Sequence, residues 1–335
     1  MIIFTLCSNN YLPYALSLGH SIEQENPGLK FIIGLVDVLG VNDIDLFEIL
    51  PATQIVDSEV FSEMSSWYDV TELNTAVKPY YIDYFFKNGF DKVIYLDPDI
   101  LVFNKLQVIL DLLDRYEAVV TPHFNTPLPI DGKNPQDRDM LVTGVYNLGF
   151  LGIKKSDETI RFIDWWKIKL FDQCHVGNGL FTDQLWMVYI TCFLDRVKVL
   201  RDPGYNVANW NLHERVVSLR DNQYFVNDSF PLVFFHYSNY KFRIPDRLAA
   251  YNTRYRLEDR QDIVPLYQRF TNDIIQYGIE RYELIRPAYG ITRIARKRKK
   301  TFAELGYVSK LIIIVLRRIV RSIEFRLNVD IKAKN

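Results

Sequence analysis

The chain has 335 residues, 48% hydrophobic and 24% charged, a balance that excludes a disordered protein and predicts a soluble globular one with a large core. The net charge of −1 is unevenly distributed, because residues 286–335 contain 14 Lys and Arg against 3 Asp and Glu, which leaves −12 on the rest. The three cysteines, Cys7, Cys174 and Cys192, exclude a disulfide framework and favour a reducing cytoplasm.

Targeting signals are not expected. The N-terminal sequence IIFTLC reads as a strand and lacks the basic region of a signal peptide. No apolar run reaches the ~18 residues that a transmembrane helix needs. We therefore predict a cytoplasmic protein without a membrane span.

Strands and helices are predicted to alternate along the first 250 residues. The patterns predict strands over residues 2–7, 30–36, 54–57, 92–96, 118–121, 148–153, 197–200 and 231–236, and helices over 13–25, 70–88, 156–172, 182–192 and 254–282. Residues 122–139 are rich in Pro, Asn and Asp and predict a long loop, a common form of lid or binding loop. The alternation favours an α/β domain with a mostly parallel sheet, whose ligands bind at the carboxyl ends of the strands.

The most informative motif is Asp97-Pro98-Asp99, which lies between two apolar, strand-like runs. Two carboxylates at the exit of a buried strand are unfavourable unless a positive group compensates them. Hard oxygen ligands suit Mg²⁺ or Mn²⁺, and such an ion can bridge to a diphosphate. A plain turn is the alternative interpretation, since Asp and Pro are common turn residues.

An ordered series of motifs resembles the nucleotide-sugar-dependent glycosyltransferases of the GT-A fold, and is most similar to the retaining family 8, which includes glycogenin and bacterial lipopolysaccharide galactosyl- and glucosyltransferases. The resemblance covers roughly residues 1–245 and implies a GT-A, Rossmann-like, mixed and mostly parallel sheet flanked by helices. We assign this domain to residues 1–250 and a helical, basic region to residues 251–335. The motifs are TLCSNNY (5–11), LNTAVK (73–78), DPD (97–99), YNLGFLG (146–152), GLFTDQLW (179–186) and FFHYSNYK (234–241).

The resemblance implies which residues hold a nucleotide-sugar donor. Thr5, Ser8, Asn10 and Tyr11 would bind the nucleoside, with Tyr11 stacked on the base. Asp97 would also contact the ribose, Lys78 and Lys241 would meet the phosphates, and Asn147 and Gly149 would face the sugar. From the residues alone, Asn10 equally suits a helix cap, Lys78 a solvated helix surface and Gly149 a bulge in an edge strand. Asp37 is interpreted as a surface acid in preference to a nucleoside contact.

The resemblance also implies a metal site and a reaction centre. Asp97, Asp99 and His236 would bind Mn²⁺ or Mg²⁺, while Asp183 and Gln184 would face the transferred sugar and the acceptor. His236 alone would suit a core histidine, and Thr182 a helix cap beside Asp183. Asn206 is a candidate for the acceptor cleft. The late motif departs from the family, because Asn239 replaces a glycine and Lys241 follows His236 by five residues instead of six.

The predicted activity is transfer of a sugar from a nucleoside-diphosphate sugar, preferably a UDP-sugar, to an acceptor hydroxyl in lipopolysaccharide, capsule or other cell-surface glycan synthesis. The resemblance implies retention of configuration; an inverting reaction would need Asp183 as base. One alternative is a sugar-nucleotide pyrophosphorylase, although the first turn, CSNNYLP, lacks its glycine-rich loop. Another is a catalytically degenerate, membrane-tethered binding module, against which the intact Asp97, Asp99 and His236 argue.

The basic C-terminal region predicts an amphipathic helix over about residues 290–330. The cluster RKRKK (296–300) precedes a segment, 305–327, in which Leu, Ile, Val and Phe alternate with Lys and Arg. This pattern favours peripheral attachment to an anionic surface, the inner face of the cell membrane. Packing on the protein body or on a partner subunit is the alternative. Nucleic-acid binding is not predicted, because no basic patch is interleaved with aromatic residues.

Overall fold

The computed structural model describes residues 1–39, 46–291 and 316. Met1–Gly290 form one compact unit and Ile291–Asn335 a second. The predicted amphipathic helix over residues 290–330 thus lies almost entirely outside the described residues. Within the described ranges, no helix has the length and apolar character needed to cross a membrane.

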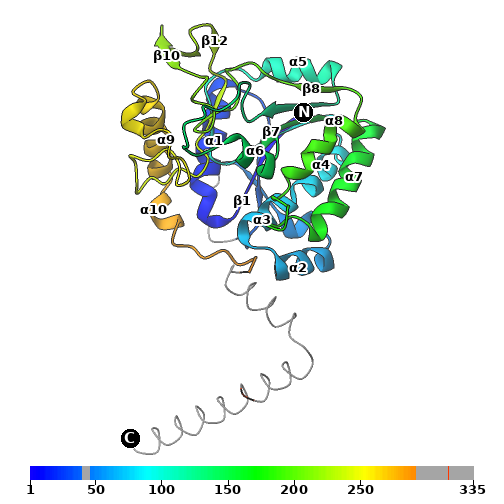
Figure 1. The fold of residues 1–335 in the computed structure, drawn as a ribbon. Coiled ribbons are helices and arrows are strands. Elements are labelled where there is room, and N and C mark those ends of the chain that lie inside the picture. Colours follow the sequence, from blue (N-terminus) through cyan, green and yellow to red (C-terminus); the bar gives the residue numbers. More distant parts are fainter. Residues whose placement is uncertain (40–45, 292–315, 317–335) are drawn as a thin grey trace, which may run out of the picture. The chain divides into compact units, whose positions relative to one another are not determined.

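A seven-stranded mixed sheet forms the centre of the first unit, in the order β3-β2-β1-β4-β7-β6-β8 (Figure 1). Only β7 runs antiparallel to its neighbours, β4 and β6. This confirms the predicted α/β class, with a mixed, mostly parallel sheet flanked by helices, as the resemblance to the GT-A fold implied. The strands are β1 (Ile2–Cys7), β2 (Phe31–Leu35), β3 (Glu48–Pro51), β4 (Lys92–Leu96), β6 (Ala118–Pro122), β7 (Tyr146–Lys154) and β8 (Val197–Val199).

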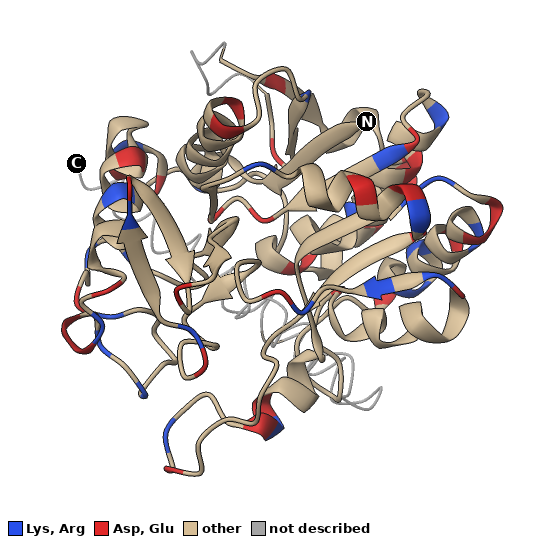
Figure 2. Ribbon diagram, turned by 90° about the horizontal axis from the view of Figure 1, so that it is seen from above, with Lys and Arg blue, Asp and Glu red and all other residues tan. Residues whose placement is uncertain are grey.

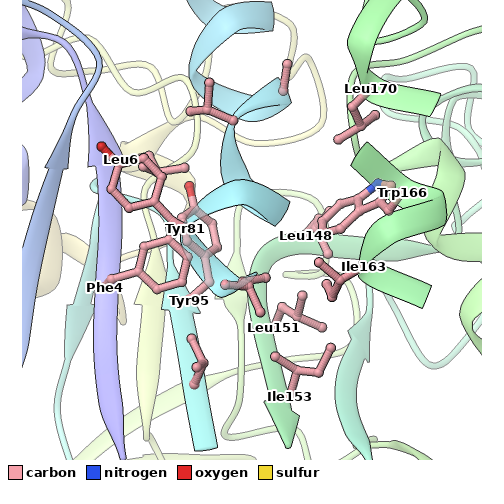
Figure 3. Packing of buried hydrophobic residues seen from close by; sticks show 14 of the residues in the cluster. Phe4, Leu6, Tyr81, Tyr95, Leu148, Leu151, Ile153, Ile163, Trp166 and Leu170 are labelled. Carbon is pink, nitrogen blue, oxygen red and sulfur yellow. The ribbon is translucent and has the colours of Figure 1, made fainter. Parts of the chain in front are cut away.

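Helices cover both faces of the sheet, because successive strand side chains point to opposite faces and both sets are apolar. In β1, Phe4 belongs to one apolar cluster and Ile3 to the other. Figure 3 shows the first cluster, in which Phe4 faces Tyr81 of a neighbouring helix; their rings stack with centroids 6.0 Å apart. This face is covered by α2 (Ser58–Trp67), α3 (Val70–Ala76), α4 (Lys78–Lys87), α7 (Asp157–Asp172) and α8 (Ile190–Phe193), and the other by α1 (Leu12–Glu25) and α5 (Gln107–Arg115).

A small second sheet determines where His236 lies. Strand β5 (Ile100–Val102) follows the Asp97-Pro98-Asp99 turn directly and pairs antiparallel with β13 (Phe234–His236). In this register Ile100 lies opposite His236, which places the histidine beside Asp99. Strand β9 (Val207–Ala208) completes this sheet, while β10 (Val217–Arg220), β11 (Gln223–Val226) and β12 (Phe230–Pro231) form a third one.

The prediction of a single helix over residues 70–88 is wrong, because this segment forms two helices, α3 and α4. Asp69 caps α3 by accepting a hydrogen bond from Glu72 N. Pro79 lies in the first turn of α4, where its missing N–H is not needed, so the chain starts a new helix there. The predicted stop at Asn88-Gly89 is confirmed, because α4 ends at Lys87 and Gly89 has φ +86°.

Three further expectations need correction. The third strand is Glu48–Pro51 instead of 54–57, because Glu48 pairs with Ile32 of β2 and Ala52–Gln54 turn as a 3-10 helix. The helix predicted over 182–192 is a 3-10 helix, Leu185–Tyr189, followed by the short α8; Thr182 has φ +45° and does not cap it. Residues 254–282 contain a 3-10 turn, then α9 (Val264–Gln276) and α10 (Ile279–Tyr282), both of which pack against α1.

The long loop that starts after β6 is fixed at several points and ends in a helix, α6 (Asp137–Thr143). The buried Arg254 donates hydrogen bonds to the carbonyls of Lys133 (3.2 Å) and Pro135 (2.9 Å) and pairs with Asp131. Near the start of the loop, Glu214 accepts hydrogen bonds from the backbone N–H groups of the 125–126 segment. Such contacts make the loop a fixed wall of the fold.

Candidate active site

Asp97, Asp99 and His236 come together at the carboxyl end of β4. Their potential ligand atoms all lie within 4.8 Å of one another. His236 Nε2 lies 3.1 Å from Asp99 Oδ1 and 3.7 Å from Asp97 Oδ2. The backbone fixes the turn, because Asp97 N donates to the carbonyl of Gly149 (2.8 Å) and Tyr237 N to that of Asp99 (2.8 Å).

Burial and neighbouring charges shift the pKa values of this cluster in opposite directions. Burial raises the pKa of Asp97, and Lys78 and His236 counteract part of that effect. Burial alone would lower the pKa of His236, but Asp99 and Asp97 outweigh it and raise that pKa. Tyr95 donates a 2.5 Å hydrogen bond to Asp97 Oδ1, which fixes one carboxylate oxygen. Two carboxylates and an imidazole are a donor set that fits a divalent cation such as Mn²⁺.

Glycine at position 149 leaves room for the histidine. A Cβ atom there would lie 2.4 Å from His236 Cε1 and 2.9 Å from Asn147 Oδ1, both closer than atoms can approach. Strand β7 lies inside the sheet, so it is not the edge strand considered from the sequence. Its pairing with β6 is irregular between Asn147 and Gly152, which is where it passes the cluster.

Asp97 and Asp99 border a cavity of about 360 Å³, here called the smaller cavity. Ser8, Asn10 and Tyr11 line it, together with Asn74, Asp97 and Asp99. Asn74 Nδ2 donates to Ser8 Oγ (2.9 Å), and Asn10 Oδ1 is buried with no hydrogen-bond partner among the described residues. Asn10 does not cap α1, which begins after Tyr11. The wall therefore offers an aromatic ring and several amide and hydroxyl groups.

A second cavity, of about 480 Å³, is here called the larger cavity. Asp97 and His236 line it, and Asp97, Thr71 and Thr75 line both spaces, so the two cavities adjoin at the cluster. The sequence-predicted residues Lys78, Asn147, Gly149, Asp183 and Gln184 also line the larger cavity. The tertiary structure thus brings residues of all six predicted motifs to the walls of the two cavities.

Lys78 and Asp183 form a buried ion pair in the wall of the larger cavity. Their Nζ and Oδ2 atoms are 2.6 Å apart, and the side chains are 1% and 3% exposed. Lys78 Nζ also donates to the carbonyl of Leu148 (3.1 Å) and lies 4.0 Å from the ring centre of Tyr95. Burial raises the pKa of Asp183, against the lowering effect of Lys78. Lys78 is therefore not the solvated helix residue considered from the sequence.

Charged residues elsewhere lie mainly on outer helices and loops, with little charge on the central strands (Figure 2).

Gln184 holds the strand that lines the larger cavity. Its Oε1 accepts hydrogen bonds from Leu148 N (2.9 Å) and Asn147 Nδ2 (3.2 Å), and its Nε2 donates to the carbonyl of Thr143 (2.8 Å). Asn206, expected in the acceptor cleft, is fully buried and supports Asn147 by donating to its Oδ1 (3.0 Å).

Two expected donor-binding residues, Thr5 and Lys241, line neither of the two cavities described. Thr5 is fully buried. Lys241 is exposed and lies near Tyr11. Burial raises the pKa of Tyr11, and the positive charge of Lys241 counteracts part of that effect.

Asp37 was interpreted as a surface acid, and this interpretation is wrong. It is 3% exposed and accepts hydrogen bonds from three backbone N–H groups, those of Asn9, Val38 and Ala288.

Two wall residues of the larger cavity, His123 and Trp210, were not singled out as site residues from the sequence. His123 and Trp210 are 5% and 4% exposed, and their rings meet edge to face, 5.4 Å apart. His123 Nδ1 and Trp210 Nε1 have no hydrogen-bond partner in the part of the chain that the structure describes. Burial lowers the pKa of His123 to about 4, so the ring is neutral at pH 7. His123 lies in the predicted loop 122–139 and Trp210 in the stretch 202–210 that also contains Asn206, and these two segments were the signals that could have indicated them.

The comparisons with known proteins give distant likenesses, and no family model matches the chain. It is 25% identical over 289 residues to the uncharacterized protein YfnF of Bacillus subtilis strain 168, covering 82% of this chain and 92% of YfnF. It is 23% identical over 180 residues to YfnD of the same strain, covering 52% of this chain and 55% of YfnD.

Solved structures that are similar to this chain include three glycosyltransferases. Galactosyltransferase LgtC, in complex with donor and acceptor sugar analogues, is 15% identical, with 82% of this chain and 96% of LgtC covered and a TM-score of 0.46. Bifunctional WbbM is 14% identical, with 85% and 52% covered and a TM-score of 0.47. GlyE of Streptococcus pneumoniae TIGR4 is 15% identical, with 87% and 66% covered and a TM-score of 0.42.

Proposed function

We propose that this protein is a metal-dependent glycosyltransferase that moves a sugar from a nucleoside-diphosphate sugar to an acceptor hydroxyl. The observation that carries the proposal is that the cluster of Asp97, Asp99 and His236 borders two adjoining cavities. A nucleotide sugar has the same order of parts: a nucleoside, a charged diphosphate and a sugar. The smaller cavity would take the nucleoside and the larger one the sugar and the acceptor, with the diphosphate at the cluster.

The donor set of the cluster supports Mn²⁺ or Mg²⁺ as the cofactor. Asp97 and Asp99 would supply oxygen ligands and His236 a nitrogen ligand. When bound, the ion would supply positive charge that stabilises the diphosphate as it leaves. Tyr95 would hold Asp97 in place through its 2.5 Å hydrogen bond, and Gly149 would leave the space that His236 occupies.

For the reaction itself, we propose retention of configuration. The bond between the anomeric carbon and the diphosphate oxygen breaks, the acceptor oxygen bonds to that carbon on the same face, and the acceptor proton goes to the leaving phosphate. Asp183 would stabilise the positive charge that develops on the sugar. Its ion pair with Lys78 supports this role over that of a general base, because the ammonium group already occupies a carboxylate oxygen at 2.6 Å.

The acceptor is proposed to be a membrane-associated glycan, such as a lipopolysaccharide or capsule precursor. The surplus of 11 positive charges over residues 286–335 supports binding to an anionic surface at the inner face of the cell membrane. Sedimentation with vesicles of phosphatidylglycerol and phosphatidylcholine would test this. The full chain should pellet with anionic vesicles, whereas equal recovery with purely zwitterionic vesicles would contradict surface binding.

Product analysis distinguishes this activity from its alternatives. The full-length chain would be incubated with UDP-, GDP-, dTDP- and CDP-sugars in Mn²⁺, Mg²⁺ or EDTA. We expect metal-dependent hydrolysis of one donor, in which water takes the place of the acceptor and gives the free sugar and a nucleoside diphosphate. This should be lost in Asp99→Ala and kept in Asp111→Ala, which removes an exposed carboxylate on α5. Formation of a nucleoside triphosphate on addition of pyrophosphate would instead identify a pyrophosphorylase. Binding of a donor without any turnover would identify a degenerate binding module.

A further inference from the structure

The C-terminal end of the first unit passes over the edge of the sheet where the smaller cavity opens. This segment, residues 285–290, is here called the strap. In Figure 1 it leads from α10 towards α2 and α3 along the lower edge of the sheet. Its Pro287 lines the smaller cavity, together with Ser8, Asn10 and Tyr11 from the opposite end of the chain.

The strap is fixed on both sides of Pro287. Before it, Ile285 packs against the α1 face of the core. After it, Ala288 N donates a 2.9 Å hydrogen bond to Asp37 Oδ1, and the ring of Tyr289 packs edge to face on Phe61 with centroids 4.9 Å apart. These contacts lie on elements from both faces of the sheet, so the strap crosses from one face to the other beside the smaller cavity.

Two details indicate that the path of the strap is specific. Asp37 is buried, and its second oxygen accepts a 3.0 Å hydrogen bond from Asn9 N, next to the cavity-lining Ser8 and Asn10. One carboxylate therefore ties the strap to the turn that carries the cavity residues. Gly290 has φ +90°, and a Cβ there would lie 3.0 Å from Val70 N, so a glycine fits this close passage over α3.

We infer that the strap is part of the nucleoside-binding site and that Pro287 contributes to holding the base or ribose. This inference rests on the proposed function, which places a nucleoside in the smaller cavity. The ring of Pro287 adds an apolar surface to a wall that already carries the Tyr11 ring and the polar groups of Ser8, Asn10 and Asn74. A nucleoside has flat apolar faces and polar edges, and such a mixed wall complements both.

The test separates nucleotide affinity from metal affinity in the full-length chain. Titration calorimetry in EDTA would give the Kd of UDP, GDP, dTDP and CDP, and electron paramagnetic resonance would give the Kd of Mn²⁺. In Pro287→Gly the apolar ring is removed, and in Ala288→Pro the N–H that Asp37 accepts is removed. We expect both variants to weaken the best-bound nucleotide by about tenfold, with an unchanged Kd for Mn²⁺ at Asp97, Asp99 and His236.

The matched control is Pro245→Gly, the same substitution at an exposed proline, which should leave both constants at the wild-type values. Wild-type nucleotide affinity in Pro287→Gly and Ala288→Pro would overturn the role of the strap and leave the proposed function intact. Parallel loss of nucleotide and Mn²⁺ affinity would also overturn it, because general loosening of the fold would then explain the result. No binding of any nucleotide by the wild type, with or without Mn²⁺, would refute the proposed function itself.

Discussion

Lys78 and Asp183 meet in a buried ion pair, with Nζ and Oδ2 2.6 Å apart in the wall of the larger cavity. Each residue belongs to a separate sequence motif, and the resemblance to the family implied separate roles for them, phosphate binding and the reaction centre. Their pairing holds the ammonium of Lys78 and the carboxylate of Asp183 at fixed positions in the wall of the site. It also makes both residues important for stability.

Replacing Lys78 by Met should destabilise the fold by about 3–5 kcal/mol, because Asp183 would remain buried without its partner. Urea denaturation of the wild type and of Lys78→Met would measure the loss. The double variant Lys78→Met/Asp183→Leu should regain much of that stability, since no unpaired charge is left behind. A loss below about 1 kcal/mol in the single variant, as for exposed pairs, would contradict the buried pairing.

Replacing Gly149 by Ala should weaken Mn²⁺ binding by at least about tenfold, because the added Cβ would force His236 away from Asp97 and Asp99. Gly152→Ala in the same strand is the matched control. A Cβ at position 152 meets its nearest neighbours at 3.4 Å, an ordinary contact, and should leave Mn²⁺ affinity unchanged. Equal affinities in the two variants, measured by electron paramagnetic resonance, would argue against His236 as a metal ligand.

Tyr95→Phe removes the hydroxyl that donates to Asp97 Oδ1, and should lower Mn²⁺ affinity by about tenfold, as loss of a group that orients a ligand typically does. Tyr81→Phe removes a comparable 2.7 Å hydrogen bond, to the carbonyl of Leu50 in β3, and is the control for a lost tyrosine hydroxyl. Both variants should lose similar stability, but only Tyr95→Phe should change metal binding. The same Mn²⁺ affinity in both would mean that Tyr95 does not position Asp97.

His123 should make stability dependent on pH between about 6.5 and 4. Burial lowers its pKa from 6.5 to about 4, so within this window the unfolded chain binds a proton that the folded chain does not. Stability then falls as the pH decreases, by up to roughly 3 kcal/mol from this residue. His123→Gln cannot titrate, and should lose less stability than the wild type between pH 7 and pH 4.5 in urea denaturation. Identical losses would show that the folded His123 takes up a proton in this range.

Sequence patterns predicted the elements that depend on local chemistry. The apolar runs of β1, β2 and β4 and the capped helix α7 lie where expected, because both sheet faces are apolar and Ser156 caps the helix by accepting a hydrogen bond from Thr159 N. The third strand was misplaced by several residues, since its position depends on pairing with β2, which no local pattern encodes.

The site residues also divide into those that a local motif predicted and those that depend on tertiary contacts. The order of the motifs predicted that Asp97, Asp99 and His236 would meet. The pairing of β5 with β13 brings this about, because it places His236 beside Asp99. Asp37 was misinterpreted because its environment comes from three separate segments, the turn at Asn9, its own neighbour Val38 and the strap at Ala288. His123 and Trp210 were missed because cavity walls built from loops leave no periodic pattern in the sequence.

By itself, the sequence determined the α/β class, the carboxylates at the end of β4 and the uneven charge of the chain, because strand periodicity, turn chemistry and net charge are properties of neighbouring residues. Only the tertiary structure decided that Lys78 forms a buried ion pair with Asp183, that Asp37 is buried, and that Pro287 lines the same cavity as Ser8 and Tyr11. The physical reason is that burial and charge pairing depend on which distant segments pack together. The desolvation and ion-pair energies of these residues therefore arise only when the chain folds.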